Sequence, residues 1–131
     1  MKPCAGCAQF HLMSDARPAF SSTLLVWGGG AIGGCVAAWL ARAGLNVNLV
    51  DADAEHVRAI ASQGLIIEGP VEQFVQRLPA LRPDEVRGTF DLILLAVKAQ
   101  ATDAAVAQLM PHLSPEGTVV SLQNGLNEVR I

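Results

Sequence analysis

The residues with the clearest chemical potential are three glycines, Gly28, Gly30 and Gly33, which have the spacing G-x-G-x-x-G. In this pattern the first glycine permits a tight strand-to-helix turn, the second lets the backbone approach a pyrophosphate, and the third lets the helix pack closely on its strands. Because N–H groups at a helix start attract anions, we expect the whole turn to bind a dinucleotide. An ordinary glycine-rich turn is the alternative. The residues expected to contact the cofactor here are Gly28, Gly29, Gly30, Ala31, Ile32 and Gly33.

A carboxylate follows this turn at a distance that suits an adenosine ribose. Asp51 lies 21 residues after Gly30, at the end of an apolar run, and can accept hydrogen bonds from both ribose hydroxyls. It would repel a 2′-phosphate, and Ala52 and Asp53 follow it rather than an arginine. Asp51 therefore favours NAD over NADP. The alternative is that Asp51 caps a helix, although Asp53 fits that role at least as well.

Two further polar residues follow apolar runs later in the chain. Lys98 comes after the run 90–97, and a lysine there could hold a cofactor phosphate, a ribose or a substrate carboxylate. Asn124, in Gln-Asn-Gly, could donate a hydrogen bond to a ribose or a substrate oxygen. Alternatively, Lys98 is an ordinary surface lysine whose aliphatic chain covers apolar surface, and Asn124 is a turn residue before Gly125.

The remaining reactive side chains give no comparable pattern. Cys4, Cys7 and His11 have metal-like spacing, but no second ligand pair follows them, so no metal site is expected. Cys35 is expected to be a buried helix residue, and neither His56 nor His112 has an evident partner. There is no Ser/His/Asp set, carboxylate pair or Walker lysine.

The elements that must position these residues alternate between strand and helix. Such alternation predicts an α/β fold of the Rossmann type, doubly wound around a mainly parallel sheet, with ligands bound beyond the carboxyl ends of the strands. The segment 71–78 is expected to pair antiparallel nearby, and 79–88 to be a loop. The expected strands are 23–27, 47–50, 65–68, 90–97 and 117–122, and the expected helices are 31–43, 54–63 and 102–113.

Composition fits a single globular domain. The chain has 131 residues, 51% hydrophobic and 16% charged, with a net charge of -3 and no basic stripe, so we expect no nucleic-acid partner. Three cysteines are too few for a disulfide framework, so we expect a protein of the reducing cytoplasm. Residues 1–22 are expected to be a loose leader before a nucleotide-binding domain over 23–131. The uncharged stretch 23–41 has the length of a membrane span, but three consecutive glycines argue against one, so no membrane partner is expected.

Several motifs together resemble the N-terminal domain of the ketopantoate reductases (2-dehydropantoate 2-reductases). The resemblance covers residues 24 to about 127, and its Leu-Ala-Val-Lys-Ala and Gln-Asn-Gly elements are more specific than the glycine pattern. It implies reduction of a 2-keto acid, ketopantoate, with NADPH, on the route to pantothenate. It also implies that the glycine turn binds the pyrophosphate, and that Lys98 and Asn124 line the cofactor and substrate cleft.

Two departures from the family qualify this resemblance. Family members usually carry an arginine after the second strand to hold the 2′-phosphate, and Ala52 stands there instead. The family also has a helical C-terminal domain that supplies the proton-donating lysine, and this sequence ends at Ile131. We therefore expect the nucleotide-binding half of a reductase, inactive alone, that self-associates or lacks its helical domain. The alternative is a non-catalytic nucleotide-binding or sensing module.

Overall fold

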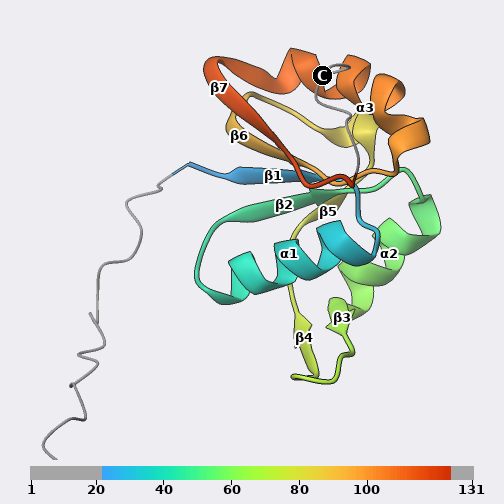
Figure 1. The fold of residues 1–131 in the computed structure, drawn as a ribbon. Coiled ribbons are helices and arrows are strands. Elements are labelled where there is room, and N and C mark those ends of the chain that lie inside the picture. The colour runs from blue at the N-terminus through green and yellow to red at the C-terminus, as the bar shows by residue number, and fades with distance from the viewer. Residues whose placement is uncertain (1–21, 125–131) are drawn as a thin grey trace, which may run out of the picture.

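The structure, a computed structural model, describes residues 22–124 and contains a parallel sheet of five strands (Figure 1). The strands lie in the order β5-β2-β1-β6-β7, so the chain builds outward from β1 first in one direction and then in the other. This reversal beside β1 is the doubly wound arrangement that the sequence predicts. The strands are β1 Leu24–Trp27, β2 Val47–Val50, β5 Ala80–Leu81, β6 Phe90–Leu95 and β7 Leu113–Ser121.

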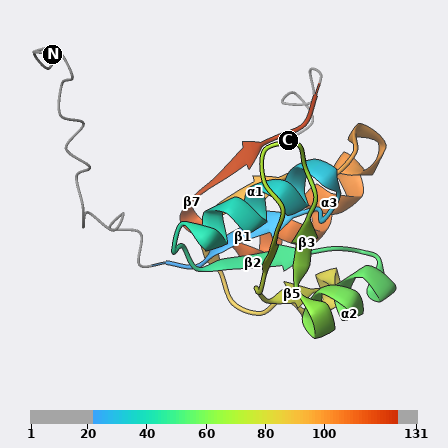
Figure 2. The ribbon, with the colours of Figure 1, turned by 90° about the horizontal axis from the view of Figure 1, so that it is seen from below.

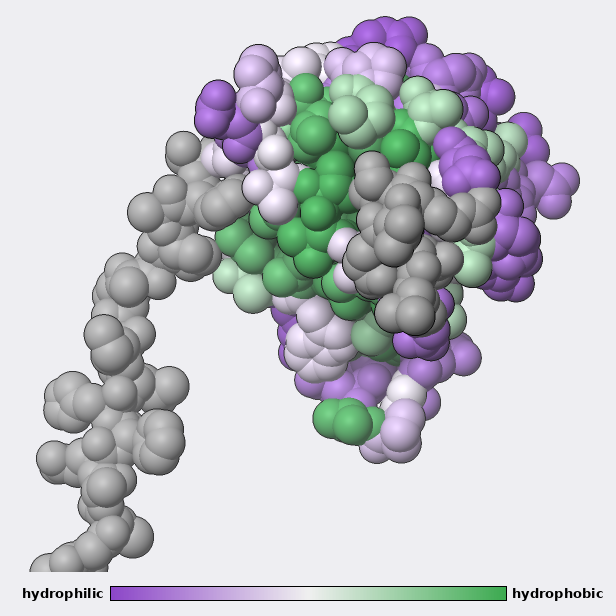
Figure 3. All heavy atoms as spheres, turned by 45° about the horizontal axis from the view of Figure 1, so that its top comes forward, coloured by the Kyte–Doolittle hydropathy of each residue, from purple (hydrophilic) through white to green (hydrophobic). Residues whose placement is uncertain are grey.

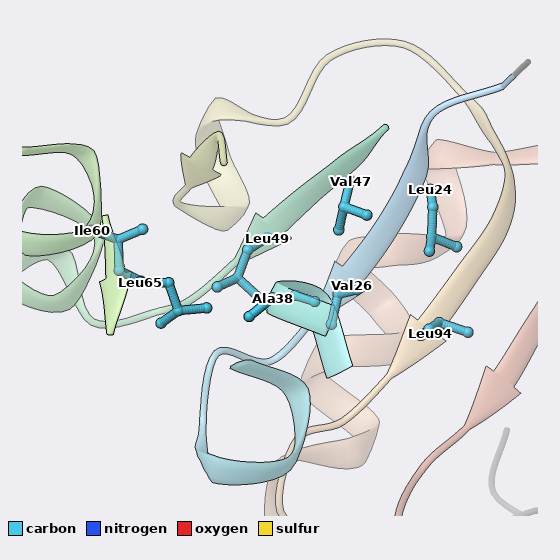
Figure 4. Close-up of a cluster of buried hydrophobic side chains, with 9 residues drawn as sticks. Leu24, Val26, Ala38, Val47, Leu49, Ile60, Leu65 and Leu94 are labelled. Atoms are coloured by element: carbon cyan, nitrogen blue, oxygen red, sulfur yellow. The ribbon is translucent and has the colours of Figure 1, made fainter. Parts of the chain in front are cut away.

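Three α-helices, α1 Ala31–Arg42, α2 Ala54–Gln63 and α3 Thr102–Leu109, cover the sheet. α1 and α2 lie on one face of it and α3 lies on the other (Figures 1 and 2). Successive strand residues point to opposite faces, and β1 accordingly supplies Leu24 and Val26 to one hydrophobic core and Leu25 and Trp27 to the other. Figure 4 shows the first of these cores, between the sheet and α1.

The inward face of α1 differs from the sequence-based expectation. The sequence pattern places Ile32, Cys35, Val36, Trp39, Leu40 and Ala43 on one apolar face of this helix and predicts that this face is turned toward the core. Val36 and Leu40 do pack against the core and are partly buried, but the buried residues of α1 are Gly33, Gly34, Ala37 and Ala38. Ile32 and Trp39 are 49% and 40% exposed, and Cys35 is exposed too. The reason is the close approach of α1 to the strands, which leaves room only for small side chains at the contact. The sequence also predicts Gly44 as the C-terminal stop of this helix, and this is confirmed, since α1 ends at Arg42 and Gly44 has φ +93°.

The region 79–88, expected to be a loop, contains the short strand β5. It pairs in parallel with β2, and Asp51 N–H donates to the carbonyl oxygen of Leu81 at 3.0 Å. A 3-10 turn, Pro83–Glu85, follows it. A strand of two residues has too few positions to show a hydrophobic period, which is why the sequence did not reveal it. β5 matters for the site because it fixes the backbone of Asp51.

A two-stranded antiparallel ribbon, β3 Leu65–Ile67 with β4 Phe74–Gln76, lies beside α1 (Figure 2). This confirms the expected antiparallel pairing. The guanidinium of Arg42 on α1 stacks over the ring of Phe74 at 4.4 Å and over that of Trp39 at 5.2 Å. Arg42 also forms an ion pair with Glu72 at 2.6 Å. These contacts fasten the ribbon to the outer side of α1.

The last strand is longer and more exposed than the sequence indicates. The segment 117–122 was expected to be a buried strand, but β7 begins at Leu113 and lies at the end of the sheet, with Val120 40% exposed. α3 correspondingly ends at Leu109, before a 3-10 turn, Met110–His112. The apolar sequence of an edge strand resembles that of a central one, and only the strand order separates them.

Apolar residues also reach the surface near the start of the described chain. Hydrophobic side chains gather on the face of the molecule that Figure 3 presents. A hollow of about 320 Å³ lies among Leu24, Leu40, Leu45, Leu92 and Leu94. No helix within residues 22–124 is long and apolar enough to cross a membrane. Nearly all of the expected leader lies outside the described residues, and so do Cys4, Cys7, His11 and Gly125.

Candidate functional site

A cleft of about 480 Å³ opens where β1, β2 and β6 end. Its lining includes Gly28, Gly29 and Gly30 after β1, Asp51 after β2, and Lys98 after β6. An adjoining hollow of about 320 Å³ shares Gly30 and Lys98 and adds Ala31, Ile32 and Asn124. In the sequence, the glycine turn, Asp51, Lys98 and Asn124 follow four different strands. The parallel topology brings them together at one edge of the sheet, where they can contact a single ligand.

The glycine turn has the backbone shape that only glycine allows at its first position. Gly28 has φ +116°, and a Cβ atom there would lie 2.7 Å from the carbonyl carbon of Ala96. The turn is held between its neighbouring strands, since Gly28 N–H donates to Val50 and Ala96 N–H donates to Trp27, both at 2.8 Å. The expectation of a tight strand-to-helix turn at Gly28 is confirmed.

The other two glycines of the pattern have opposite surroundings. A Cβ atom on Gly33 would overlap the carbonyl oxygen of Gly28 and lie 2.9 Å from Cβ of Ala96, which confirms the expected close packing of α1 on the turn. A Cβ atom on Gly30 would have no heavy atom within 4 Å, so the space before Gly30 is open. Gly30 is the N-cap of α1, and no side chain caps that end of the helix. Its first N–H groups therefore lie at the cleft, where they can attract an anion.

Asp51 reaches the glycine turn from the end of β2. A Cβ atom on Gly29 would meet Oδ2 of Asp51, so the carboxylate packs directly against the turn. Its Oδ1 accepts the N–H of Asp53 at 2.9 Å, and the side chain is 18% exposed. Asp53 caps α2 by accepting the N–H groups of Glu55 and His56, so of the two aspartates that could fill this role it is Asp53 that does. Asp51 is therefore not the helix cap, and its carboxylate remains on the cleft wall.

His56 is a member of the site that the sequence did not reveal. Its Nδ1 lies 2.8 Å from Oδ2 of Asp51, and its side chain is 37% exposed. The partner is five residues earlier, across the turn between β2 and α2. The available signal was a histidine in the first helical turn after an aspartate at a strand end. The other described histidine, His112, donates a hydrogen bond from Nδ1 to the carbonyl oxygen of Gly88 and stacks on Trp27, on the opposite side of the sheet.

Lys98 and Asn124 are brought to the same hollow by a partly buried hydrogen-bond network around the amide of Gln123. The Nε2 atom of Gln123 donates to the carbonyl oxygen of Val97 at 2.7 Å and to the hydroxyl of Thr102 at 2.8 Å. Thr102 has no exposed surface. Gln123 thus ties the end of β7 to the loop between β6 and α3, and so sets the spacing of the two neighbouring residues. The sequence singled out Asn124 and Gln123 as a motif without showing this bridging role.

The arrangement suits an extended ligand with anionic and hydroxyl groups. The N–H groups at the start of α1 can bind an anion, and the Asp51 carboxylate can accept hydrogen bonds from hydroxyls. Lys98 and Asn124, in the adjoining hollow, add an ammonium and an amide group. Within residues 22–124, no group of three or more His, Cys, Asp or Glu side chains is arranged to hold a metal ion.

Comparison with known proteins gives a consistent result. The family model described as "Ketopantoate reductase PanE/ApbA" matches residues 24–131. Among curated proteins, the 2-dehydropantoate 2-reductase of Mesorhizobium japonicum is 36% identical over 104 residues, which are 79% of this chain and 32% of that protein. The chain therefore spans about a third of the length of the curated relatives it matches.

Solved structures share the fold at similar coverage. The PanE/ApbA family ketopantoate reductase of Ralstonia eutropha has a TM-score of 0.74 and 35% identity, over 82% of this chain and 36% of that one. A D-mandelate dehydrogenase, solved with NADH and anilino(oxo)acetate, has a TM-score of 0.77 and 28% identity, over 82% of this chain and 35% of that one.

Proposed function

Because the chain belongs to the ketopantoate reductase PanE/ApbA family, we propose that it forms the nucleotide-binding half of a nicotinamide-dependent reductase of 2-keto acids. The observation that carries the proposal is the meeting of the glycine turn, Asp51, Lys98 and Asn124 around one cleft. Each of these comes from a different strand end. The glycine turn and Asp51 match the pyrophosphate and the adenosine ribose of a dinucleotide, and Lys98 and Asn124 match a keto-acid substrate beside it.

The cofactor pyrophosphate is placed at the N-terminus of α1, before Gly30. Open space there and the uncapped helix N–H groups support this placement. The adenosine ribose then meets Asp51, whose carboxylate accepts from hydroxyls. Relatives support a nicotinamide cofactor in general, since one neighbour was solved with NADH. Asp51, followed by Ala52, favours NADH, whereas the family resemblance implies NADPH.

The substrate is placed at the hollow that Lys98 and Asn124 line. When bound, a reduced nicotinamide supplies a hydride to the carbonyl carbon of a keto acid. The Lys98 ammonium can pair with the substrate carboxylate, and the Asn124 amide can donate to a substrate oxygen. Protonation of the resulting alkoxide requires a general acid. In the family this acid comes from the helical domain, so we propose that residues 1–131 bind nucleotide without turning over substrate.

A fluorescence titration tests this proposal directly. Trp27 lines the cleft and Trp39 lies across α1 against Phe74, so Trp39→Phe leaves Trp27 as the single tryptophan reporter. We expect NADH to quench Trp27, and Gly30→Asp, which places a carboxylate before the helix N-terminus, to weaken binding about tenfold or more. The proposal fails if neither NADH nor NADPH binds. Turnover of ketopantoate by the chain alone would overturn the part of it that assigns the general acid elsewhere.

The alternative of a sensing module makes a different prediction. A module that only senses cofactor has no use for a substrate-facing lysine. Under our proposal, Lys98→Ala weakens the binding of a keto acid to the nucleotide complex more than it weakens the binding of nucleotide. Equal keto-acid binding by Lys98→Ala and the parent chain would favour the sensing module.

A further inference from the structure

His56 is a titratable group beside the glycine turn that the proposed function leaves without a role. Its imidazole lines a hollow of about 490 Å³ together with Gly29, Gly30, Cys35 and Glu68. Asp51, its partner at 2.8 Å, lines the neighbouring cleft that also contains Gly29 and Gly30. The cleft and this hollow meet at Gly29 and Gly30 of the glycine turn, where the cofactor phosphates are placed. The Asp51–His56 pair therefore lies at the boundary between the two, with Asp51 facing the cleft and His56 facing the hollow.

The protonation of His56 decides what its outer nitrogen can offer a ligand. An ionised carboxylate only accepts hydrogen bonds, so Nδ1 of His56 carries the proton that is donated to Asp51. In the neutral ring Nε2 is then an acceptor, and in the imidazolium it is a donor. A phosphate group needs donors and positive charge. Neutral His56 thus offers a phosphate nothing at Nε2, whereas protonated His56 offers an N–H group and a charge.

We propose that His56 is a specificity-determining residue that makes the choice between NADH and NADPH depend on pH. The inference rests on the proposed function. At high pH the charge of Asp51 is unopposed, and its carboxylate disfavours a 2′-phosphate on the ribose. At low pH the His56 imidazolium offsets that charge and donates to the phosphate. Histidine is the side chain whose charge ordinarily changes between about pH 5 and 8, so the test compares the two ends of that range.

The other charged groups around His56 do not supply a competing cation. On its own helix, Glu55 and Arg58 are 90% and 74% exposed and pair with each other at 4.0 Å, and Asp53 caps the helix. From β3 and the residues after it, the hollow receives Glu68, and from α1 it receives the thiol of Cys35. Among the described residues that line this hollow, His56 is the only one whose side chain can carry a positive charge.

The test measures the dissociation constants of NADH and NADPH at about pH 5.5 and about pH 8, with Trp27 as the reporter in Trp39→Phe. We expect the affinity for NADPH relative to NADH to rise about threefold to tenfold at the lower pH, because the pair is partly exposed and screened. His56→Gln keeps an N–H donor for Asp51 but cannot become charged. His56→Lys keeps a positive charge at both pH values.

The variants separate His56 from other titrating groups. The 2′-phosphate itself ionises near pH 6, so the pH effect that remains in His56→Gln belongs to the ligand, and the excess in the parent belongs to His56. His56→Lys should favour NADPH at both pH values, and His112→Gln, on the other side of the sheet, should behave as the parent. An equal pH effect in the parent and His56→Gln overturns the inference while NADH binding stands. Failure of both nucleotides to bind overturns the proposed function and this inference with it.

Discussion

Two adjacent glycines of α1 should respond in opposite ways to the same substitution. A Cβ atom on Gly33 would overlap the carbonyl oxygen of Gly28 and lie 2.9 Å from Cβ of Ala96. A Cβ atom on Gly34 would meet nothing closer than the carbonyl oxygen of Gly29 at 3.5 Å, which is an ordinary van der Waals contact. Gly33→Ala therefore requires α1 to move away from the turn, and Gly34→Ala requires no movement.

The expected magnitudes follow from these contacts. Overpacking against backbone atoms costs about 3 kcal/mol, while alanine has an advantage over glycine of about 1 kcal/mol within a helix. Gly33→Ala should thus lower the free energy of unfolding by about 2 kcal/mol, and Gly34→Ala should raise it by up to about 1 kcal/mol. For a domain of this size, a difference of about 3 kcal/mol separates the two melting temperatures by roughly 12 °C or more.

Urea unfolding of the two variants and the parent, followed by circular dichroism, measures these free energies. Nucleotide titration adds a second readout, since a displaced α1 moves the N-terminus that is proposed to hold the pyrophosphate. Gly33→Ala should then bind NADH more weakly than Gly34→Ala. Equal unfolding midpoints for the two variants would refute the reasoning, because they would mean that α1 does not approach the turn as closely as described.

Three further predictions concern stability and assembly. Asp53→Ala removes the cap of α2 and should lower the free energy of unfolding by about 1 kcal/mol in urea unfolding; an unchanged midpoint would contradict this. Gln123→Leu leaves the buried hydroxyl of Thr102 without its donor and should cost about 1–3 kcal/mol in the same assay, whereas a neutral result would show that the network relaxes. Self-association remains a prediction from the apolar hollow that contains Leu24 and Leu92, and sedimentation as a single monomer at all concentrations would contradict it.

The sequence predicted those parts of the fold that have strong local signals. Glycines mark the ends of β1, α1 and α2, and parallel topology alone requires that Asp51, Lys98 and Asn124 meet at one sheet edge. The convergence of the site could therefore be predicted before any distance was known. The pairing of Asp51 with His56 could not, because it depends on the angle at which α2 leaves β2 and not on a spacing rule.

The wrong predictions share a physical cause, which is that hydrophobicity reports burial only on average. Because α1 lies close to the sheet, Ala37 and Ala38 face inward, and Trp39 instead contacts Arg42 and the β3–β4 ribbon. β7 is as apolar in sequence as a central strand, yet it lies at the edge of the sheet. Both outcomes depend on which surface lies opposite, and a single sequence does not contain that information locally.

The fastening of the β3–β4 ribbon by Arg42 has a consequence for motion. The ribbon has strands of only three residues and its own small set of hydrogen bonds, and Ile66 and Val75 are more than half exposed. Such a unit can open locally without unfolding the five-stranded sheet, and its amides should exchange with solvent sooner than those of β1. Because Leu65 and Ile66 also line the hollow around His56, each opening would briefly widen that hollow while the glycine turn stays in place.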